Sequence, residues 1–305
     1  MKILIIGTGS VGGFLGYKLI NSDQDVSFLV REHRKDEVDR KGITIIQDGK
    51  ASNIKVRTIS SVTGDDHFDV VFISVRNYDL ESLKSSLLKL NEKGSKFISL
   101  LNGIRHIDYL IPLVGIENLI GGSVSMETRR DKDGNIIYIS QKPTITVGTE
   151  FSANLDIINE IEKTLRKAGF DVQLKSNVFQ SVWEKYLFNL ACNMTAVLSA
   201  TVKEIKNNDC AIASTINLVN EAFLVSRRIG VGLGSKSRDL AIRKFLEMRD
   251  DFRSILAEDV LNNRSNESEF LFGYLGKLCE NNRMNCPTIK LSCAVLKAMS
   301  RKSPL

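Results

Sequence analysis

Short apolar runs alternate with amphipathic helical patterns through residues 1–176. The runs Lys2–Ile6 and Val70–Val75 predict buried strands, whereas the apolar positions of Val11–Ile20 and Leu80–Leu90 recur at helical spacing. Alternation of this kind is typical of a parallel sheet with helices on both faces. The same pattern predicts further strands at Val26–Val30, Phe97–Leu101, Leu119–Val124, Ile136–Ser140, Thr144–Gly148 and Val172–Leu174.

One pair of apolar runs departs from this alternation. Gly42–Ile46 and Ile54–Ile59 lie on either side of the dipeptide Asp48-Gly49. Asp-Gly is a favoured two-residue turn between antiparallel strands. We therefore expect a hairpin to be inserted after the second strand.

From Asn177 onward the pattern is helical, and we find no strand pattern of comparable quality there. The expected helices are Val178–Leu198, Ala211–Arg228, Leu240–Glu247, Asp250–Asn262, Glu269–Glu280 and Thr288–Ser300. The predicted fold class is α/β. An N-terminal Rossmann-type, doubly wound parallel sheet in residues 1–176 precedes an all-helical domain in residues 177–305.

The composition is that of a globular protein. Of the 305 residues 43% are hydrophobic and 26% charged, and no apolar run reaches the ~18 residues of a membrane span. The apolar start of the chain is too short for a secretory signal, so we expect a cytoplasmic protein without a membrane partner. The five cysteines form no Cys-x-x-Cys pair, which favours buried thiols over a metal site.

The net charge of +6 suggests nucleic-acid binding, but the rest of the sequence argues against it. Lysine and arginine are dispersed, aromatic residues make up only 7%, and no basic–aromatic run occurs. A mildly positive protein also attracts small anions such as a dinucleotide or a carboxylate. We therefore expect small anionic ligands and no nucleic acid.

A glycine-rich segment follows the first predicted strand. Gly7-Thr8-Gly9-Ser10-Val11-Gly12 matches the G-x-G-x-x-G pattern, with an apolar strand before it and an apolar-periodic helix after it. Gly7 then permits the tight turn, Gly9 lets the backbone approach a pyrophosphate, and Gly12 lets the helix pack on the strand. A purely structural glycine turn is the alternative, and the context favours dinucleotide binding.

The end of the second predicted strand bears on the choice of cofactor. An NAD-preferring fold places an acid there, but this chain reads Val30-Arg31-Glu32-His33-Arg34-Lys35. The Arg31 guanidinium can hold a 2′-phosphate by two hydrogen bonds, which favours NADP(H) over NAD(H). Two alternatives stay open. Glu32 could occupy the ribose-diol position if the strand ends one residue later, and Arg34 and Lys35 could lie in a solvated loop.

A line of polar residues crosses an otherwise apolar helical segment. Lys185, Asn189 and Asn193 are spaced four apart and so lie on one side of a helix. Large apolar residues fill most other positions between Val182 and Val197, which predicts a buried helix. A buried ammonium with two amides is costly unless something polar meets it, and this predicts a ligand site. An exposed edge of a half-buried helix is the alternative.

An acidic position opens a later helix. Asn266-Glu267-Ser268-Glu269 precedes the apolar stretch Phe270–Leu275. Glu267 or Glu269 could act in the ligand site, or could simply be a carboxylate stabilised by the helix dipole. Spacing alone does not choose between these.

The order of the motifs resembles the ketopantoate reductase (2-dehydropantoate 2-reductase) family across nearly the whole chain. The matching pieces are the glycine loop, Leu101-Asn102-Gly103, Trp183-Glu184-Lys185 with Asn189 and Asn193, and Asp259, Glu267 and Gly273 ahead of Pro287. The Lys-x3-Asn-x3-Asn piece after the tryptophan is the most specific of them.

The resemblance implies an NADPH-dependent reduction of a 2-keto acid, with 2-dehydropantoate as the leading substrate and pantothenate biosynthesis as the setting. It makes Lys185 the general acid at the keto oxygen, a role that suits an ammonium because alkoxide charge develops there. A homodimer is compatible with the resemblance. The other implied roles are cofactor contacts for Arg31, Arg76 and Asn102, and substrate contacts for Asn102, Asn189, Asn193, Ser254 and Glu267, the last also supporting catalysis.

Two positions depart from the family's pattern. Arg76 stands where the family often carries lysine, which keeps the charge but changes its geometry. The family's Ser-Ser-Met or Pro-Ser-Met stretch is here Ser254-Ile255-Leu256, so Ile255 takes the place of the substrate-binding serine. A reductase of another small 2-keto acid therefore stays open as an alternative. So does an NADP(H)-binding redox sensor without turnover, although a pure binder would not need Lys185.

Overall fold

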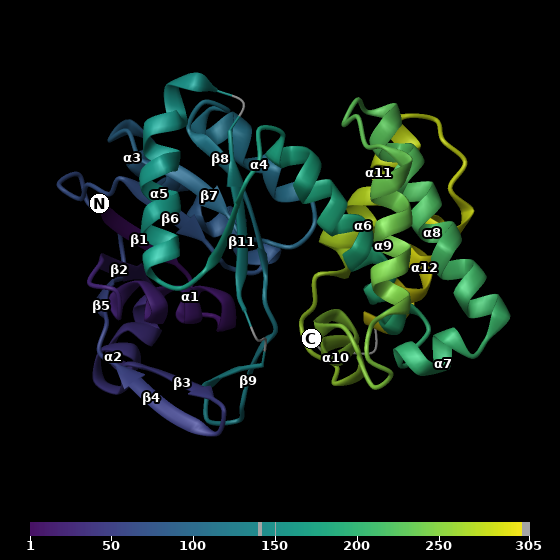
Figure 1. Ribbon diagram of the computed structural model, residues 1–305, viewed down its shortest axis with the longest axis horizontal. Helices are drawn as coiled ribbons and strands as arrows, with labels where there is room; N and C mark the ends of the chain where they lie inside the picture. The colour runs from purple at the N-terminus through teal and green to yellow at the C-terminus, as the bar shows by residue number, and fades with distance from the viewer. Residues whose placement is uncertain (140–141, 150, 301–305) are drawn as a thin grey trace. The chain divides into compact units, whose positions relative to one another are not determined.

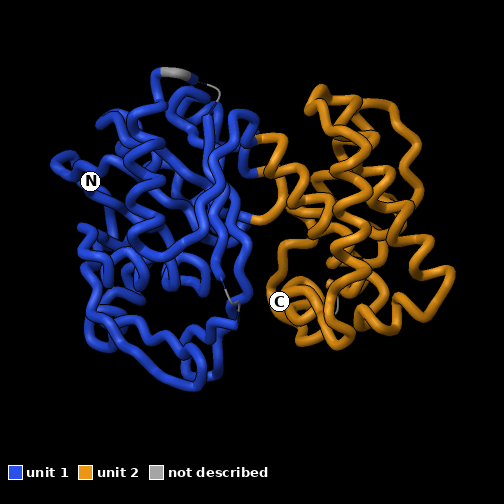
Figure 2. The backbone as a smooth tube through the Cα atoms, viewed as in Figure 1, with its two compact units in different colours: residues 1–101, 106–178 blue, residues 102–105, 179–305 orange. Residues whose placement is uncertain are grey.

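The computed structural model describes residues 1–139, 142–149 and 151–300, and its contacts divide it into two compact units. The first unit comprises Met1–Leu101 and His106–Val178, and the second comprises Asn102–Arg105 with the chain from Phe179 onward (Figure 2). The short segment Asn102–Arg105 thus packs with helices that lie far from it in the sequence. This matters for function because the segment begins with a predicted site residue.

The first unit is built on one large sheet. Within the described residues eight strands lie in the order β12-β11-β8-β7-β6-β1-β2-β5 (Figure 1). They are β1 (Lys2–Ile6), β2 (Asp25–Leu29), β5 (Arg57–Ile59), β6 (Val70–Ile73), β7 (Lys96–Ser99), β8 (Leu119–Ser125), β11 (Thr144–Gly148) and β12 (Asp171–Leu174). From β5 to β8 all neighbours are parallel, and β1 and β6 are almost wholly buried. The predicted Rossmann-type α/β fold is confirmed.

The parallel part of the sheet ends at β8. β11 runs antiparallel to β8, and β12 is parallel to β11, so two strands at one edge are reversed. The connection is the physical reason. Where the structure describes it, the chain passes from β8 to β11 through two short strands and no helix, and parallel neighbours usually need a crossover helix.

A second, smaller sheet has the strand order β4-β3-β10-β9. It consists of β3 (Ile43–Gln47), β4 (Lys50–Ile54), β9 (Thr128–Arg130) and β10 (Ile136–Tyr138). The predicted hairpin exists, but its second arm is Lys50–Ile54 and not residues 54–59. The two-residue turn at Asp48-Gly49, both with positive φ, sets Gln47 opposite Lys50, so the arm must start there. Residues 57–59 pair instead with β2. Ser140, at the end of another predicted strand, lies outside the described residues.

Helices connect the strands of the first unit. They are α1 (Ser10–Ile20), α2 (Glu32–Lys41), the 3₁₀ segments Asn77–Leu83 and Ser152–Asn154, α3 (Lys84–Glu92), α4 (Arg105–Val114) and α5 (Leu155–Lys167). The amphipathic pattern predicted α1, and it predicted the second helix that here starts as a 3₁₀ segment. The solvated loop considered for Arg34 and Lys35 is in fact α2. Its only apolar residue, Val38, gives no hydrophobic period, and i,i+4 pairs such as Lys35–Asp39 (2.6 Å) support it instead.

The second unit is helical, and residues 177–300 contain no strand where the structure describes them. Its helices are α6 (Val178–Val197), α7 (Val202–Lys206), α8 (Asp209–Arg228), α9 (Ser235–Leu246), α10 (Ile255–Leu261), a π-helical turn (Glu269–Gly273), α11 (Tyr274–Asn281) and α12 (Pro287–Ser300). Side-chain caps fix several starts: Thr201 and Glu204 form a capping box on α7, and Asn208 caps α8. Among the described residues, none of the helices has the length and apolarity that crossing a bilayer would require.

Candidate active site

The glycine loop joins β1 to α1 in the first unit. Gly7 has φ of +104°, a conformation that side chains rarely adopt. A methyl group at Gly12 would overlap Ser74 Oγ and the Gly7 carbonyl oxygen, so only glycine lets α1 pack so closely on the sheet. These two glycines are therefore required by the fold itself.

Gly9 differs from its two neighbours in the loop. Its φ is −64°, which any residue adopts, and an added methyl would meet only Ser74 O at an ordinary 3.8 Å. The protein therefore leaves room above Gly9 that it does not use. Gly9 also caps α1 without a side chain, so the first N–H groups of the helix keep their capacity to bind an anion. The loop fits a pyrophosphate, as a dinucleotide cofactor would require.

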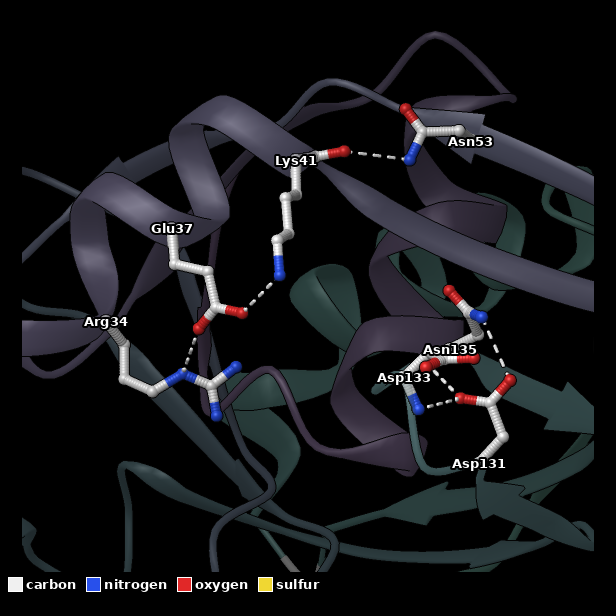
Figure 3. Close-up of polar contacts among 7 residues, drawn as sticks. All are labelled: Arg34, Glu37, Lys41, Asn53, Asp131, Asp133 and Asn135. Carbon is white, nitrogen blue, oxygen red and sulfur yellow. Dashed lines mark hydrogen bonds and ion pairs between the residues drawn. The ribbon is translucent and has the colours of Figure 1, made fainter.

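At the end of β2, Arg31 lies just ahead of α2 and is mostly exposed. Its guanidinium makes an ion pair with Asp79, a residue of the 3₁₀ segment that follows β6. Glu32 is the first residue of α2, beyond the strand's end at Leu29. Arg34 and Lys41 both face Glu37, at 3.5 Å and 3.0 Å (Figure 3). Arg76 is half-buried and immediately precedes the segment that contains Asp79.

The predicted polar line lies along α6 in the second unit. Lys185 and Asn189 are half-buried and Asn193 is only 7% exposed, while Tyr186, Leu187 and Leu190 on the same helix are fully buried. Over the chain as described, neither the Lys185 ammonium nor the Asn193 amide has a hydrogen-bond partner. A helix that buries polar groups without partners has a free-energy cost that a bound polar ligand would offset.

Burial changes the acidity of Lys185. Removal of the ammonium from water lowers its pKa from the ordinary value to about 8. No carboxylate among the described residues pairs with it to oppose that effect. Lys185 can therefore be protonated at neutral pH and still release its proton readily.

Asn102 comes from a different part of the chain. It follows β7, belongs by its contacts to the second unit, and its Oδ1 accepts a hydrogen bond from Asn189 Nδ2 at 3.4 Å. Three residues later the Arg105 guanidinium lies 4.6 Å from the centre of the Phe270 ring. The structure thus brings together Asn102 and Asn189, which the sequence could link only through the family resemblance.

Ser254 anchors α10 to α6. Its hydroxyl caps α10 by accepting from Ala257 N at 3.1 Å, and its backbone N–H donates to Thr195 Oγ1 at 3.1 Å. Thr195 lies two residues beyond Asn193, off the polar line, so no periodicity marked it in the sequence. Ile255, the first residue of α10, leaves 48% of its surface exposed.

Glu267 is buried just before the π-helical turn. Two carbonyls of that turn accept side-chain hydrogen bonds: Tyr186 Oη donates to Leu271 O at 2.6 Å, and Cys293 Sγ donates to Phe272 O at 3.1 Å. Tyr186 is the neighbour of Lys185, so the turn is fixed to the helix that carries the polar line. Single π turns are frequent at functional sites.

Within the described part of the chain, no group of three or more potential metal ligands comes together. The first unit has the fold and the glycine loop that are typical of dinucleotide-binding domains, and such domains are common among nicotinamide-dependent oxidoreductases.

Comparison with known families identifies which one. The family model described as ketopantoate reductase PanE/ApbA matches residues 3–150, and the model of its C-terminal part matches residues 177–300. The chain belongs to the ketopantoate reductase family, whose members reduce 2-keto acids with a nicotinamide cofactor.

Two curated relatives match over almost the full length. The uncharacterized oxidoreductase YkpB of Bacillus subtilis is 25% identical over 97% of this chain and 98% of its own. The 2-dehydropantoate 2-reductase of Pyrococcus horikoshii is 23% identical over 98% of this chain and 97% of its own.

Solved structures share the fold. D-mandelate dehydrogenase, solved with NADH and anilino(oxo)acetate, superposes with a TM-score of 0.89 at 19% identity, covering 99% of this chain and 98% of that one. A dimeric ketopantoate reductase from Staphylococcus aureus superposes with a TM-score of 0.81 at 20% identity, covering 100% of both chains.

Proposed function

We propose that the protein reduces 2-dehydropantoate to pantoate with NADPH, with Lys185 as the general acid. The observation that carries the proposal is the lone, partly buried Lys185, with a pKa of about 8, in line with Asn189 and Asn193 on α6. The family and the Pyrococcus horikoshii relative support the choice of substrate. In this proposal residues 1–176 bind the cofactor and residues 177–305 bind the substrate, in the cytoplasm.

The bound nicotinamide would supply a hydride to the keto carbon. Lys185 Nζ would hydrogen-bond the keto oxygen, stabilise the negative charge that develops there, and transfer its proton to it, so that the carbonyl becomes a secondary alcohol. A lysine of ordinary pKa would bind the oxygen but release the proton less readily. Burial of Lys185 without a carboxylate partner among the described residues lowers its pKa and so makes the proton easier to release.

The amides and the carboxylate would orient the substrate. Asn193 has an unused donor and acceptor, and Asn189 offers whatever its contact with Asn102 leaves free, so both suit the hydroxyl of 2-dehydropantoate. Asn102 would lie by the nicotinamide. Glu267 would assist substrate binding, and the hydroxyl of Ser254 keeps its hydrogen available while its oxygen caps α10. Arg76 is proposed to hold a phosphate or the substrate carboxylate.

A second substrate class is favoured by one residue. The exposed Ile255 replaces the serine that the family uses, which removes a donor and adds an apolar surface. An apolar 2-keto acid would suit that surface, and the structural neighbour solved with a phenyl-bearing ligand, D-mandelate dehydrogenase, has the same fold. The alternative of a redox sensor without turnover has no comparable support, because a protein that only binds the cofactor would not need the proton donor Lys185.

The test is to measure NADPH oxidation by the purified protein with a panel of keto acids. 2-Ketoisovalerate lacks the hydroxymethyl group of ketopantoate, and benzoylformate carries a phenyl ring in place of the branched chain. Ile255→Ser is measured beside the wild type. We expect ketopantoate to have the highest kcat/KM, and the serine to improve it by up to about 10- to 150-fold, the worth of a hydrogen bond to a charged group. A tenfold higher kcat/KM for benzoylformate or 2-ketoisovalerate would reject ketopantoate as the substrate. No turnover with any of the three would reject the proposal that the protein is a keto acid reductase.

A second copy of this chain is the proposed partner, as in the dimeric Staphylococcus aureus enzyme. Light scattering on the purified protein tests this. A mass of one chain at micromolar concentration would reject it.

A further inference from the structure

The cation predicted to read the 2′-phosphate is already engaged. Arg31, which follows β2, pairs with Asp79 of the 3₁₀ segment that follows β6, two strands away in the sheet. The contact uses one terminal nitrogen of the guanidinium, and the carboxylate offsets part of its charge. If the protein selects NADPH, as proposed above, further cations near the glycine loop can add to that selection.

The small sheet brings such a cation to the loop. Residue 13 of α1 is a glycine, and a methyl there would overlap Ile136 of β10, so the small sheet packs directly against α1. The adjacent strand β9 ends at Arg130, whose guanidinium donates to the carbonyl oxygen of Thr8. Thr8 is the second residue of the glycine loop. An arginine 122 positions away in the sequence therefore lies at the loop that would hold the cofactor.

Arg34 of α2 lies within electrostatic range of Arg130. Burial together with the positive charge of Arg34 lowers the pKa of the Arg130 guanidinium, while Glu37 acts in the opposite direction. Arg130 is an exposed residue, but the surrounding protein removes part of the water from its guanidinium. Two like charges held together at a partly desolvated place destabilise the protein unless an anion joins them.

Among the described residues, Glu37 is the carboxylate whose charge acts on Arg130, and cations of α2 already share it. Glu37 accepts from Lys41 at 3.0 Å, and its other oxygen lies 3.5 Å from Arg34 Nε. That Nε is buried and, among the described residues, makes no hydrogen bond. Figure 3 shows the terminal nitrogens of Arg34 extending beyond the Glu37 contact. Arg34 and Lys41 thus share Glu37, and Arg130 lies within electrostatic range of the same carboxylate.

We propose that Arg34 and Arg130 together bind the 2′-phosphate of NADPH, with the small sheet holding Arg130 at the glycine loop. Both guanidiniums present planar forks, and a phosphate has enough oxygens to accept from both. The inference rests on the proposed use of NADPH. It adds residues of α2 and β9 to the selection of the cofactor, beside Arg31 after β2.

Calorimetry with the purified full-length chain at fixed ionic strength tests this. NADPH, NADH and the fragments adenosine 2′,5′-bisphosphate and AMP are titrated into wild type, Arg34→Met and Arg130→Met. We expect each variant to lose about 10- to 150-fold in affinity for NADPH and the bisphosphate, as for one lost charge-assisted contact. Affinity for NADH and AMP should change less than about twofold.

A matched control has the same chemistry. Arg129→Met removes the preceding arginine of β9, whose side chain points to the opposite face of the strand, and it should keep the NADPH preference. Arg31→Met is titrated as a third test variant, because Arg31 is itself an expected cofactor contact. Because Arg130 also contacts Thr8, Arg34→Met separates phosphate binding from any effect on the loop.

The outcomes separate this inference from the proposed function. A wild type that binds NADH as tightly as NADPH rejects the use of NADPH itself. A wild type that prefers NADPH, with the preference intact in Arg34→Met and in Arg130→Met, overturns the Arg34–Arg130 assignment alone, whether or not Arg31→Met loses it. Equal losses for NADPH and NADH in both variants overturn it too, because the pair would then hold the pyrophosphate.

Discussion

The cations of the two units are placed in opposite ways. In α2 and β9, arginines and lysines lie near the surface, share carboxylates and crowd one another. On α6, Lys185 is a single cation among apolar residues and amides. Guanidiniums stay charged at any physiological pH, so the first arrangement suits permanent anion binding. The second suits proton transfer, because burial moves the pKa of an ammonium into the working range.

The largest expected effect breaks the second arrangement. Lys185→Met removes the proton donor while keeping most of the side-chain volume, and kcat for keto acid reduction should fall by about 10²- to 10⁴-fold. NADPH affinity should stay within about twofold. Lys277→Met, an exposed lysine of α11 paired with Glu269, is the control and should keep full turnover. Wild-type turnover in Lys185→Met would show that another group donates the proton.

The pH profile sharpens the comparison. Because the pKa of Lys185 is about 8, its proton is available below pH 8 and lost above it. We expect kcat/KM for reduction to fall about tenfold per pH unit above that point, whereas the dissociation constant of NADPH should stay nearly constant up to pH 9.5. A kcat/KM that remains level to pH 10 would exclude Lys185 as the titrating acid.

A smaller effect is expected at the cation cluster. Glu37→Gln removes the carboxylate that Arg34 and Lys41 share, so it should leave more positive charge for a 2′-phosphate. NADPH should bind about two- to fivefold more tightly, in proportion to the modest energy of exposed ion pairs. NADH titrations on the same variant provide the control. Weaker NADPH binding would show that Glu37 positions Arg34 rather than competes for it.

The smallest effect concerns stability. The pKa of Lys185 is lower in the folded than in the unfolded protein, so between about pH 8 and 10.5 the unfolded chain binds more protons and stability rises with pH. The ammonium therefore destabilises the fold fully below pH 8. Lys185→Met should raise Tm at pH 7 by about 2–4 °C and by less at pH 10. Thermal melts at both pH values measure this, and an equal shift at both would argue against the burial effect.

The elements that the sequence predicted well are those whose buried residues recur at regular spacing or form an unbroken run. β1 and β11 agree with their predicted bounds, and α1 and α6 agree to within a residue, because each has a buried stripe or a wholly buried run. α2 and β4 escaped prediction or were misplaced because α2 buries just Val38 and β4 is almost wholly exposed. Ion pairs and a tight turn hold them, and neither leaves a hydrophobic pattern.

The same limit applies to the site. Spacing alone grouped Lys185, Asn189 and Asn193, because one helix carries all three. Thr195 with Ser254, and Asn102 with Asn189, needed the tertiary structure, since their contacts join distant parts of the chain. Arg130 had no motif at all. Arg130 reaches the glycine loop because of the register in which β9 pairs with β10. The residues next to Arg130 in the sequence do not reveal that register.

The unused space above Gly9 distinguishes glycines that the fold requires from a glycine that only a bound ligand would require. The fold forbids a side chain at Gly7 and Gly12, but nothing in the protein itself forbids alanine at Gly9, where only a bound cofactor would clash. In a descendant that kept the fold but no longer bound a nucleotide, Gly9 would therefore be substituted before Gly7 and Gly12. Among related sequences, a substitution at Gly9 with Gly7 and Gly12 retained would mark a protein that lost cofactor binding while keeping its fold.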